Sequence, residues 1–302
     1  MGHTASCCDA CTDSGCTTPG HQIKTVFIIM LENHDWSSIK GSSSAPYING
    51  TLLPAFAHAE NYRTGGQYPS LPNYITLEAG DDMGLAKTSP LPTDYRIDTK
   101  DHLTTYLQRR SIPWKSYSEN LPGNGASCVL VDGTLYSVDH NAFSYFNDVT
   151  GNPPSASNAY CIAHVRPYSE FAGDLQNDRV GRYNFIIPND VDQGEKTASA
   201  GSSKVKQCDA WLANEVPRIQ ASRAYQDGGA IFIVWDEGAT HGIDNPIGLI
   251  VVSPLAKRGY SNTLPYSHAS TLRSVQEIFG LTPLLRKAAT ATDLSDLFTT
   301  FP

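Results

Sequence analysis

The chain has 302 residues, of which 40% are hydrophobic and 17% are charged, and its formal net charge is -8 at pH 7. This acidic balance argues against a general nucleic-acid binder, because no basic stripe is present to neutralise phosphates. No apolar run approaches the roughly 20 residues that a membrane-spanning helix needs. The length suffices for one large domain with a sizeable core.

The cysteines are concentrated near the N-terminus. Four of the seven crowd the segment CCDACTDSGC, and three stand far apart: Cys7, Cys8, Cys11 and Cys16, then Cys128, Cys161 and Cys208. We interpret this usage as that of an exported protein with disulfides, since Cys128 and Cys161 lie in loop-like sequence that a covalent link would hold. The alternative for the N-terminal cluster is a zinc knuckle, because Cys8 and Cys11 have C-x₂-C spacing.

The first residues, MGHTAS, contain no hydrophobic signal core. This start fits a secreted or periplasmic protein whose leader has been removed, and a cytosolic protein is the alternative. An odd number of cysteines leaves one thiol free or paired between chains. We predict a Cys-rich N-terminal extension over residues 1–22 and one domain over residues 23–302.

Apolar runs that end in polar or acidic residues recur along the chain and predict buried strands. They lie at residues 26–31, 183–192, 228–238 and 246–254, and helices are predicted at residues 100–111, 208–222 and 268–280. Continuous apolar strands that alternate with helices indicate an α/β domain with a mostly parallel sheet covered on both faces. The regions 41–99 and 122–168 are rich in Ser, Gly, Asn and Pro, and we expect long loops there.

Two of these strands end in the same way. Glu32 and Asn33 follow the first, and Asp236 and Glu237 follow the third. Ligands of such sheets bind at the carboxyl ends of the strands, and crowded carboxylates repel one another unless a cation holds them. The pairs therefore predict a divalent metal site in which oxygen ligands favour Ca²⁺ or Mg²⁺, while Zn²⁺ also accepts carboxylates. The alternative is that the acids are solvated.

A single serine lies between two prolines in the segment YPSLPNYITLEAG. Ser70 follows Pro69 and precedes Pro72 at a predicted helix start. The free N–H groups and positive dipole end of a helix N-terminus hold anions, so this hydroxyl is placed to attack one. The alternative is a serine that only caps the helix.

The motifs taken together resemble a known family. FIIMLENHDWSSI, YPSLPNYITLEAG, WKSYSENLP, DHNAFSYF, DAWLANEVP, VWDEG and SHASTLRSVQEIFGL stand in the order seen in the bacterial phosphoesterase family of secreted acid phosphatases and phospholipases C. That family is a branch of the alkaline phosphatase superfamily. The similarity extends over about residues 23–285, and it implies an alkaline phosphatase-like single domain with a mostly parallel central sheet flanked by helices.

The resemblance also implies roles for individual residues. Glu32, Asn33 and Asp236, with Glu237 less securely placed, would bind one divalent metal ion. Ser70 would be the nucleophile, a further ligand, and the site of a phosphoserine intermediate. His140 and His268 match positions of functional histidines that would donate to phosphate or protonate the leaving alcohol, and Asn120 would stabilise a phosphoryl oxygen or only end a turn.

The sequence departs from this family at one place. After the strand that ends in IIPN, many relatives carry an acidic loop with a histidine, whereas this chain reads NDVDQGEKTAS. In the wider superfamily this region helps bind a second metal, so the departure favours a single ion. It also leaves the leaving-group acid open: Asp192 is one candidate, and a solvated loop is the alternative.

The leading hypothesis is a metal-dependent phosphomonoesterase of broad specificity that acts on small phosphate esters, with no organic cofactor. A phospholipase C, another phosphodiesterase or a phosphoinositide phosphatase is the alternative within the same chemistry, and would take a phospholipid. The alternative from another class is a binding protein that has kept the fold without the activity.

Overall fold

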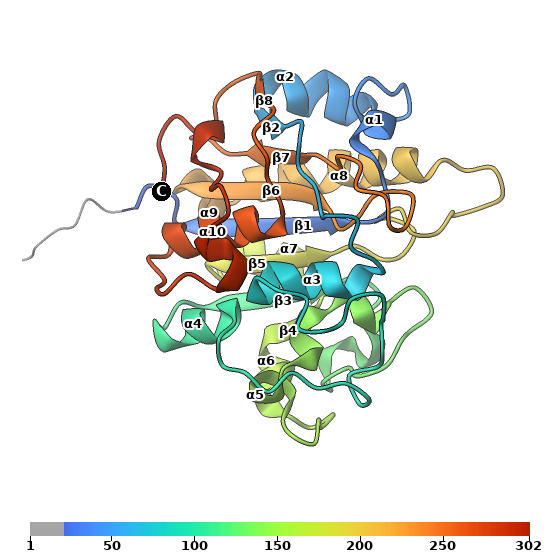
Figure 1. The fold of residues 1–302 in the computed structure, drawn as a ribbon, viewed down its shortest axis with the longest axis vertical. Helices are drawn as coiled ribbons and strands as arrows, with labels where there is room; N and C mark the ends of the chain where they lie inside the picture. The colour runs from blue at the N-terminus through green and yellow to red at the C-terminus, as the bar shows by residue number, and fades with distance from the viewer. Residues whose placement is uncertain (1–20) are drawn as a thin grey trace, which may run out of the picture.

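The computed structural model describes residues 21–302, which form one mixed α/β domain around an eight-stranded sheet (Figure 1). The strand order is β4-β3-β5-β1-β6-β7-β2-β8. Neighbouring strands in this sheet are parallel except that β7 runs against both β6 and β2. The predicted mostly parallel sheet is therefore confirmed.

The strands are β1 (Thr25–Leu31), β2 (Ala57–Ala59), β3 (Trp114–Ser118), β4 (Val165–Pro167), β5 (Tyr183–Ile187), β6 (Gly229–Trp235), β7 (Leu249–Val252) and β8 (Tyr260–Asn262). The four strands predicted from apolar runs are β1, β5, β6 and β7. Every residue of β1 and β6 is buried, because helices cover the sheet on both sides and leave no polar face for the side chains to alternate toward.

The α-helices are α1 (Trp36–Ile39), α2 (Leu53–Ala55), α3 (Ser70–Ala79), α4 (Leu103–Arg109), α5 (Asn147–Thr150), α6 (Ala159–His164), α7 (Phe171–Gln176), α8 (Lys204–Gln220), α9 (Arg223–Gln226) and α10 (His268–Ile278). Shorter turns of 3₁₀ or π type are η1 (Ile48–Leu52), η2 (Pro122–Gly125), η3 (Val138–His140), η4 (Ala142–Tyr145), η5 (Tyr168–Glu170), η6 (Arg286–Ala289) and η7 (Ser295–Leu297). In Figure 1, α3 and α10 lie on the near side of the sheet and α8 lies on the far side.

The three predicted helices are present with shifted ends. The first begins at Leu103 instead of Lys100, and the last begins at His268 as predicted. The middle helix begins four residues earlier than predicted, at Lys204, because the Ser203 side chain accepts a hydrogen bond from the backbone N–H of Lys206 and so caps the helix.

The expectation of long loops at residues 41–99 and 122–168 was wrong in part. The first region contains η1, α2, β2 and α3, and the second contains α5, α6 and β4. Composition misled here because Ser, Asn and Pro serve as helix caps and first-turn residues as readily as they serve loops. In α3, all ten residues are buried, so tertiary packing selects the helix.

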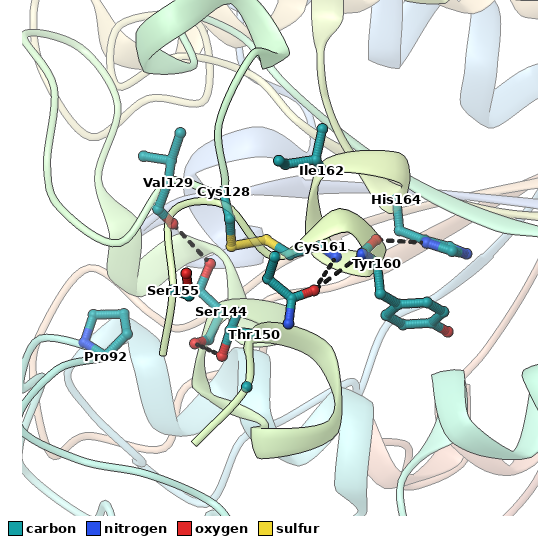
Figure 2. Close-up of a disulfide and its surroundings, with 12 residues drawn as sticks. Pro92, Cys128, Val129, Ser144, Thr150, Ser155, Tyr160, Cys161, Ile162 and His164 are labelled. Atoms are coloured by element: carbon teal, nitrogen blue, oxygen red, sulfur yellow. Dashed lines mark hydrogen bonds between the residues drawn. A yellow bond between two sulfur atoms is a disulfide. The ribbon is translucent and has the colours of Figure 1, made fainter. Parts of the chain in front are cut away.

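A disulfide joins two segments of the second region, between Cys128 and Cys161 (Figure 2). Cys161 lies in the short helix α6, which begins where the Asn158 side chain accepts hydrogen bonds from the N–H groups of Tyr160 and Cys161. Cys208 is free and buried. The predictions for Cys7, Cys8, Cys11 and Cys16 fall on residues outside the described part, and the domain boundary at residues 22 and 23 stays a prediction.

The two ends of the described chain meet. The backbone N–H of Gln22 donates to the carbonyl of Pro302 over 2.8 Å, at the edge of the sheet where β1 begins. None of the helices within residues 21–302 is both long enough and apolar enough to span a membrane. The carboxyl ends of the parallel strands lie at the opposite edge, on the right of Figure 1.

Candidate active site

The two acidic strand ends predicted from the sequence lie side by side. β1 and β6 are parallel neighbours in which Leu31 pairs with Trp235. The backbone N–H of Asp236 donates to the carbonyl of Leu31 over 2.9 Å, and the backbone N–H of Asn33 donates to Asp236 Oδ1 over 3.1 Å. The structure therefore brings Glu32, Asn33 and Asp236 together, as the common edge of parallel strands requires.

Glu32 is at the centre of the site and is fully buried. Its Oε2 accepts a hydrogen bond from Ser70 Oγ over 2.8 Å, and its Oε1 accepts one from the Tyr74 hydroxyl over 2.6 Å. The residue at the first strand end and the predicted nucleophile are thus in direct contact. This contact joins two segments that are 38 residues apart in the chain.

Helix α3 presents Ser70 to Glu32. Ser70 is the first residue of the helix and follows the N-cap Pro69, which has extended backbone angles. Pro72 lies in the first turn, where its missing N–H costs no hydrogen bond. The helix ends at Gly80, whose φ of +77° provides the left-handed conformation and whose added Cβ would clash with the carbonyl of Leu285. Both ends of the helix that carries the serine are therefore fixed.

Asn33 adopts a left-handed backbone conformation with a φ of +53°, which asparagine tolerates better than most residues. Its side-chain Nδ2 donates to Glu32 Oε2 over 3.3 Å and also to Glu195 Oε2. Its Oδ1 is buried and has no hydrogen-bond partner within residues 21–302. The amide therefore directs its nitrogen at carboxylates and leaves its oxygen free.

The acids of this site carry unfavourable charge. Burial raises the pKa of Glu32 well above its usual value, and the neighbouring Asp236 raises it further. Burial likewise raises the pKa of Asp236. For Glu237, burial followed by the charges of Asp236 and Glu195 raises the pKa to about 9. No lysine or arginine forms an ion pair with any of these four carboxylates in the described part of the chain.

These residues fit a divalent cation. Asp236 Oδ2, like Asn33 Oδ1, is buried and lacks a hydrogen-bond partner among residues 21–302, and an orphaned buried oxygen is costly unless something binds it. A positive ion would satisfy both oxygens and offset the repulsion between Glu32 and Asp236. In the described residues, no three His, Cys, Asp or Glu side chains already surround one point, so the set would use an amide and a hydroxyl as well.

Glu237 lies at the rim of the site. Its Oε2 accepts from Asn73 Nδ2 over 3.4 Å, and its Oε1 is 3.3 Å from His241 Nε2. The His241 ring stacks on Tyr68, two residues before the serine. Glu237 therefore joins the strand end to α3 and to the exposed His241.

His140 faces Glu32. Its ring stacks on Tyr74 with an interplanar angle of 9°, and its Nε2 is 3.7 Å from Glu32 Oε1. Its Nδ1 is 2.9 Å from Gln193 Nε2, which donates to it. Because Nδ1 accepts, the neutral ring carries its proton on Nε2 and points that N–H toward the carboxylate.

His268 is held differently, because both of its ring nitrogens contact protein atoms. Nε2 donates to the backbone carbonyl of Asp236 over 2.7 Å, and Nδ1 is 3.0 Å from the Tyr62 hydroxyl. Burial lowers the pKa of His268 to about 4, so the ring is neutral at neutral pH. These contacts support a role in fixing the end of β6, and the predicted donation to phosphate stays a prediction.

Asn120 is exposed in the turn after β3, with a φ of +53°. No contact between it and Glu32, Ser70 or Asp236 is found within residues 21–302. Its neighbour Glu119 instead accepts hydrogen bonds from Asn189 and Trp211, and burial raises the pKa of Glu119 to about 7. The predicted role of Asn120 in the site stays a prediction.

The segment after β5 contributes residues that the sequence analysis missed. The sequence departs from the family in this segment because it lacks the histidine of the relatives, yet Gln193 contacts His140 and Glu195 contacts Asn33. Asp190 is buried and pairs with Lys196 over 2.6 Å, so it is not part of a solvated loop, whereas Asp192 accepts from Asn189 over 2.7 Å. The local sequence NDVDQGEK carries no signal for the contacts of Gln193 and Glu195, because their partners His140 and Asn33 lie in distant segments of the chain.

Most of the chain matches a family of known proteins. The model of the phosphoesterase family matches residues 45–282. The chain belongs to the phosphoesterase family. The family model includes α3 with Ser70, the segment after β5 and the end of β6.

Curated relatives have related names. A protein of Mycobacterium tuberculosis named "Phosphatidylinositol-3-phosphatase" is 26% identical over 90% of this chain and 82% of its own length. A Kluyveromyces lactis protein named "Probable acid phosphatase" is 25% identical over 88% of this chain, and an Aspergillus fumigatus "Acid phosphatase" is 25% identical over 86%. The chain spans only 61% and 56% of the lengths of these two fungal relatives.

Solved structures share the fold. A phosphonate monoester hydrolase of Agrobacterium radiobacter superposes with a TM-score of 0.57 at 12% identity, covering 91% of this chain and 77% of that one. A Vibrio parahaemolyticus protein in the alkaline phosphatase superfamily has a TM-score of 0.56 at 9% identity, covering 92% and 72%. The alkaline phosphatase-like architecture expected from the sequence is therefore confirmed.

Proposed function

We propose that this protein is a phosphoric ester hydrolase, with monoesters of broad structure as its substrates and Ser70 as its nucleophile. The observation that carries the proposal is the 2.8 Å hydrogen bond between Ser70 Oγ and Glu32 Oε2 at a strand edge crowded with uncompensated carboxylates. Membership of the phosphoesterase family and relatives named as phosphatases support the same chemistry.

Ser70 would attack phosphorus and form a phosphoserine. The Oγ–P bond forms as the P–O bond to the leaving alcohol breaks, and water then releases phosphate and regenerates the hydroxyl. Glu32 Oε2 orients Oγ and is the acceptor that lies nearest to its proton. Because Ser70 begins α3, the free N–H groups of the first turn lie beside the attacking oxygen and favour an anion there.

Glu32, Asn33, Asp236 and Ser70, with Glu237 at the rim, would hold one divalent cation. When bound, the cation would lower the pKa of the serine hydroxyl and neutralise charge on a phosphoryl oxygen. The oxygen-only donor set favours Ca²⁺ or Mg²⁺ over softer ions. Asn33 Oδ1 and Asp236 Oδ2 support this assignment, because both are buried without a partner among the described residues.

His140 would supply a proton donor to the phosphoryl group or the leaving alcohol. Its Nδ1 is engaged by Gln193, and its Nε2–H points toward Glu32, beside which Ser70 lies. His268 and Asn120 complete the predicted set. For His268 we propose that it fixes the carbonyl of Asp236 and the end of β6.

The second candidate is a phosphoinositide phosphatase, favoured by the Mycobacterium relative that this chain matches over 82% of that protein's length. A phospholipase C or another phosphodiesterase remains the alternative among enzymes that hydrolyse phosphoric esters. A binding protein without activity remains the alternative that is not an enzyme. The disulfide between Cys128 and Cys161 supports export of the protein to an oxidising compartment.

Hydrolysis of p-nitrophenyl phosphate against its bis-ester, with and without a chelator, tests the proposal. We expect the monoester to be cleaved, the chelator to abolish turnover, and Ser70→Ala to lose at least about a hundredfold in kcat. Ser261→Ala, which alters an exposed serine of the edge strand β8, is the matched control. Unchanged turnover in Ser70→Ala would remove the mechanism, and a panel of phosphoinositides and phosphatidylcholine separates the candidate substrates.

A further inference from the structure

The amide of Asn33 can serve a cation in only one of its two orientations, because its oxygen binds metal ions and its NH₂ group does not. In the structure Nδ2 is turned toward two carboxylates, those of Glu32 and Glu195, and Oδ1 is left without a partner among residues 21–302. Rotation of the amide by half a turn would set Oδ1 against both carboxylates, where like partial charges repel. The carboxylates therefore select the orientation.

We propose that Glu195 is the positioning residue that fixes the Asn33 amide with its oxygen turned to the cation. This inference rests on the proposed function. Glu32 also accepts from Nδ2, over 3.3 Å, but Glu32 is itself a candidate ligand and accepts from Ser70 and Tyr74 as well. Glu195 is the acceptor that remains available to the amide when Glu32 is engaged by the ion. Partners of this kind commonly orient metal ligands.

Contacts on either side of Glu195 hold it at this place. The backbone N–H of Glu32 donates to the carbonyl of Gln193 over 2.9 Å, which fastens the segment to the end of β1. On the other side, Lys196 Nζ pairs with the buried Asp190 over 2.6 Å, and the Lys196 N–H donates to the Asp190 carbonyl. Glu195 thus lies between two anchored residues and reaches Asn33 across 162 positions of sequence.

Two variants separate orientation from charge. We expect Glu195→Ala to weaken the binding of Mg²⁺ or Ca²⁺ by about 10- to 100-fold in calorimetric titrations of the full chain. Glu195→Gln retains an oxygen that accepts from Asn33 Nδ2, so its affinity should stay within about threefold of wild type. An affinity of Glu195→Gln as low as that of Glu195→Ala would overturn the inference in favour of a charge or ligand role.

A double-mutant cycle with Asn33→Asp provides the sharper test. An aspartate has two equivalent oxygens and needs no orientation, so Glu195→Ala should no longer weaken cation binding in that background. An equal loss in both backgrounds would contradict the inference. The thermal midpoint of each cation-free variant is measured alongside, and a folded Glu195→Gln protein keeps the test valid where Glu195→Ala is unstable.

Measurement of kcat tests the role of Glu195 independently of the cation-binding titrations. At saturating cation, kcat of Glu195→Ala should return to the wild-type value, because the serine and its partners are unchanged. Asp98→Ala, which removes an exposed acid before α4, is the matched control and should bind the cation as wild type does. Tight cation binding and hydrolysis in wild type with no loss in Glu195→Ala would overturn this inference alone. Absence of cation binding in wild type would overturn the proposed function with it.

Discussion

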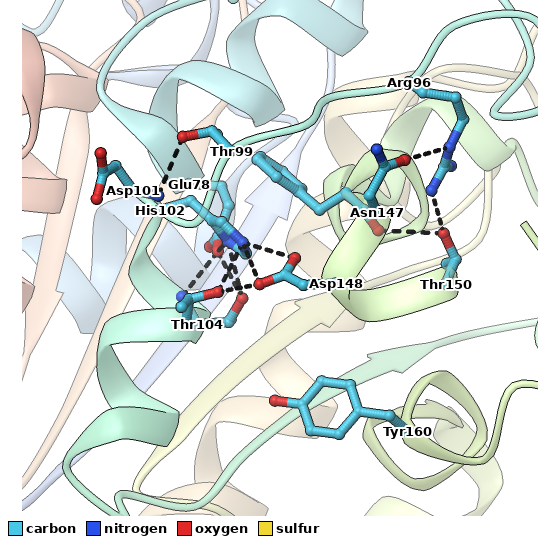
Figure 3. Close-up of polar contacts among 12 residues, drawn as sticks. Glu78, Arg96, Thr99, Asp101, His102, Thr104, Asn147, Asp148, Thr150 and Tyr160 are labelled. Atoms are coloured by element: carbon cyan, nitrogen blue, oxygen red, sulfur yellow. Dashed lines mark hydrogen bonds and ion pairs between the residues drawn. The ribbon is translucent and has the colours of Figure 1, made fainter. Parts of the chain in front are cut away.

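Two buried clusters of acids lie at opposite ends of α3, and they differ in how their charge is compensated. At the start of the helix, Ser70 contacts Glu32 beside Asp236, and burial raises the pKa of both acids. Near its end, Glu78 belongs to a second cluster with His102 and Asp148 (Figure 3). We call these the strand-end cluster and the histidine cluster.

The histidine cluster supplies its own cation. His102 is fully buried, with Nδ1 2.8 Å from Glu78 Oε1 and Nε2 3.0 Å from Asp148 Oδ1, so both nitrogens donate to carboxylates. Burial by itself lowers the pKa of His102, but the hydrogen bonds with Asp148 and Glu78 outweigh it and the net pKa is raised. Burial alone would raise the pKa of Asp148. The hydrogen bond with His102 lowers it, and the resulting pKa of Asp148 is below its usual value.

The comparison separates buried charged groups that stabilise the fold from buried charged groups that are placed to bind a ligand. In the histidine cluster, Thr104 donates through both its N–H and its hydroxyl to Glu78 Oε1, while Glu78 Oε2 is buried without a partner among residues 21–302. The histidine cluster joins α3 to α4 and to α5, so it stabilises the fold. The strand-end cluster also leaves Asp236 Oδ2 without a partner, and among residues 21–302 no lysine or arginine pairs with Glu32 or Asp236 to offset their charge. A protein retains such a cost where a ligand relieves it.

The largest expected effect is on turnover. Asp236→Asn should lower kcat by about a thousandfold, which corresponds to ~4 kcal/mol of lost transition-state stabilisation. The same variant removes one of two repelling buried charges, so its cation-free thermal midpoint should equal or exceed that of wild type. Activity and thermal unfolding measured on one preparation check both statements. A large loss of stability would break the contrast between the clusters.

His102→Ala should produce the opposite pattern. It leaves Glu78 and Asp148 buried beside each other without a cation, which we expect to cost ~3 kcal/mol of unfolding free energy in urea. The chemistry at Ser70 should persist in the folded fraction at low temperature, with KM unchanged. Loss of kcat without loss of stability would instead assign the histidine cluster to catalysis.

A divalent cation should stabilise one cluster only. At a concentration 100 times its Kd, Mg²⁺ or Ca²⁺ should add ~2.7 kcal/mol to the unfolding free energy of wild type. The cation should add the same unfolding free energy to His102→Ala. It should add much less to Asp236→Asn, because only that variant lacks one of the proposed metal ligands. Calorimetry with and without chelator measures the three shifts, and an equal shift in all three would place the ion elsewhere.

The pH dependence of stability is the smallest expected effect. Because the folded pKa of His102 is raised, its contribution is fully present below the usual value near 6.5 and is lost as pH rises through the raised value. The difference in unfolding free energy between wild type and His102→Gln should therefore narrow as the pH rises from 6 to 9. Urea unfolding at each pH measures this difference, and a constant value would show that His102 is neutral in the fold.

Much of the site could be predicted, because its acids follow buried strands directly. The apolar run before Glu32 and the run before Asp236 each specify a buried strand, and a parallel sheet brings their ends to one edge. The local sequence of Ser70 is equally that of a helix cap, and its predicted role as nucleophile came from the resemblance to the phosphoesterase family. Glu195, Gln193 and Tyr74 were not, because nothing local indicates which face of a loop or helix meets a distant strand end.

The sequence by itself determined the class of fold and the chemical character of the site, since burial and chain direction follow from patterns of a few residues. Only the tertiary structure decided which side chains touch: that Ser70 binds Glu32, that Asn33 turns its NH₂ to Glu195, and that His268 faces the backbone of Asp236. The reason is physical. These contacts join residues far apart in the chain, and their geometry depends on how helices and loops pack against the sheet.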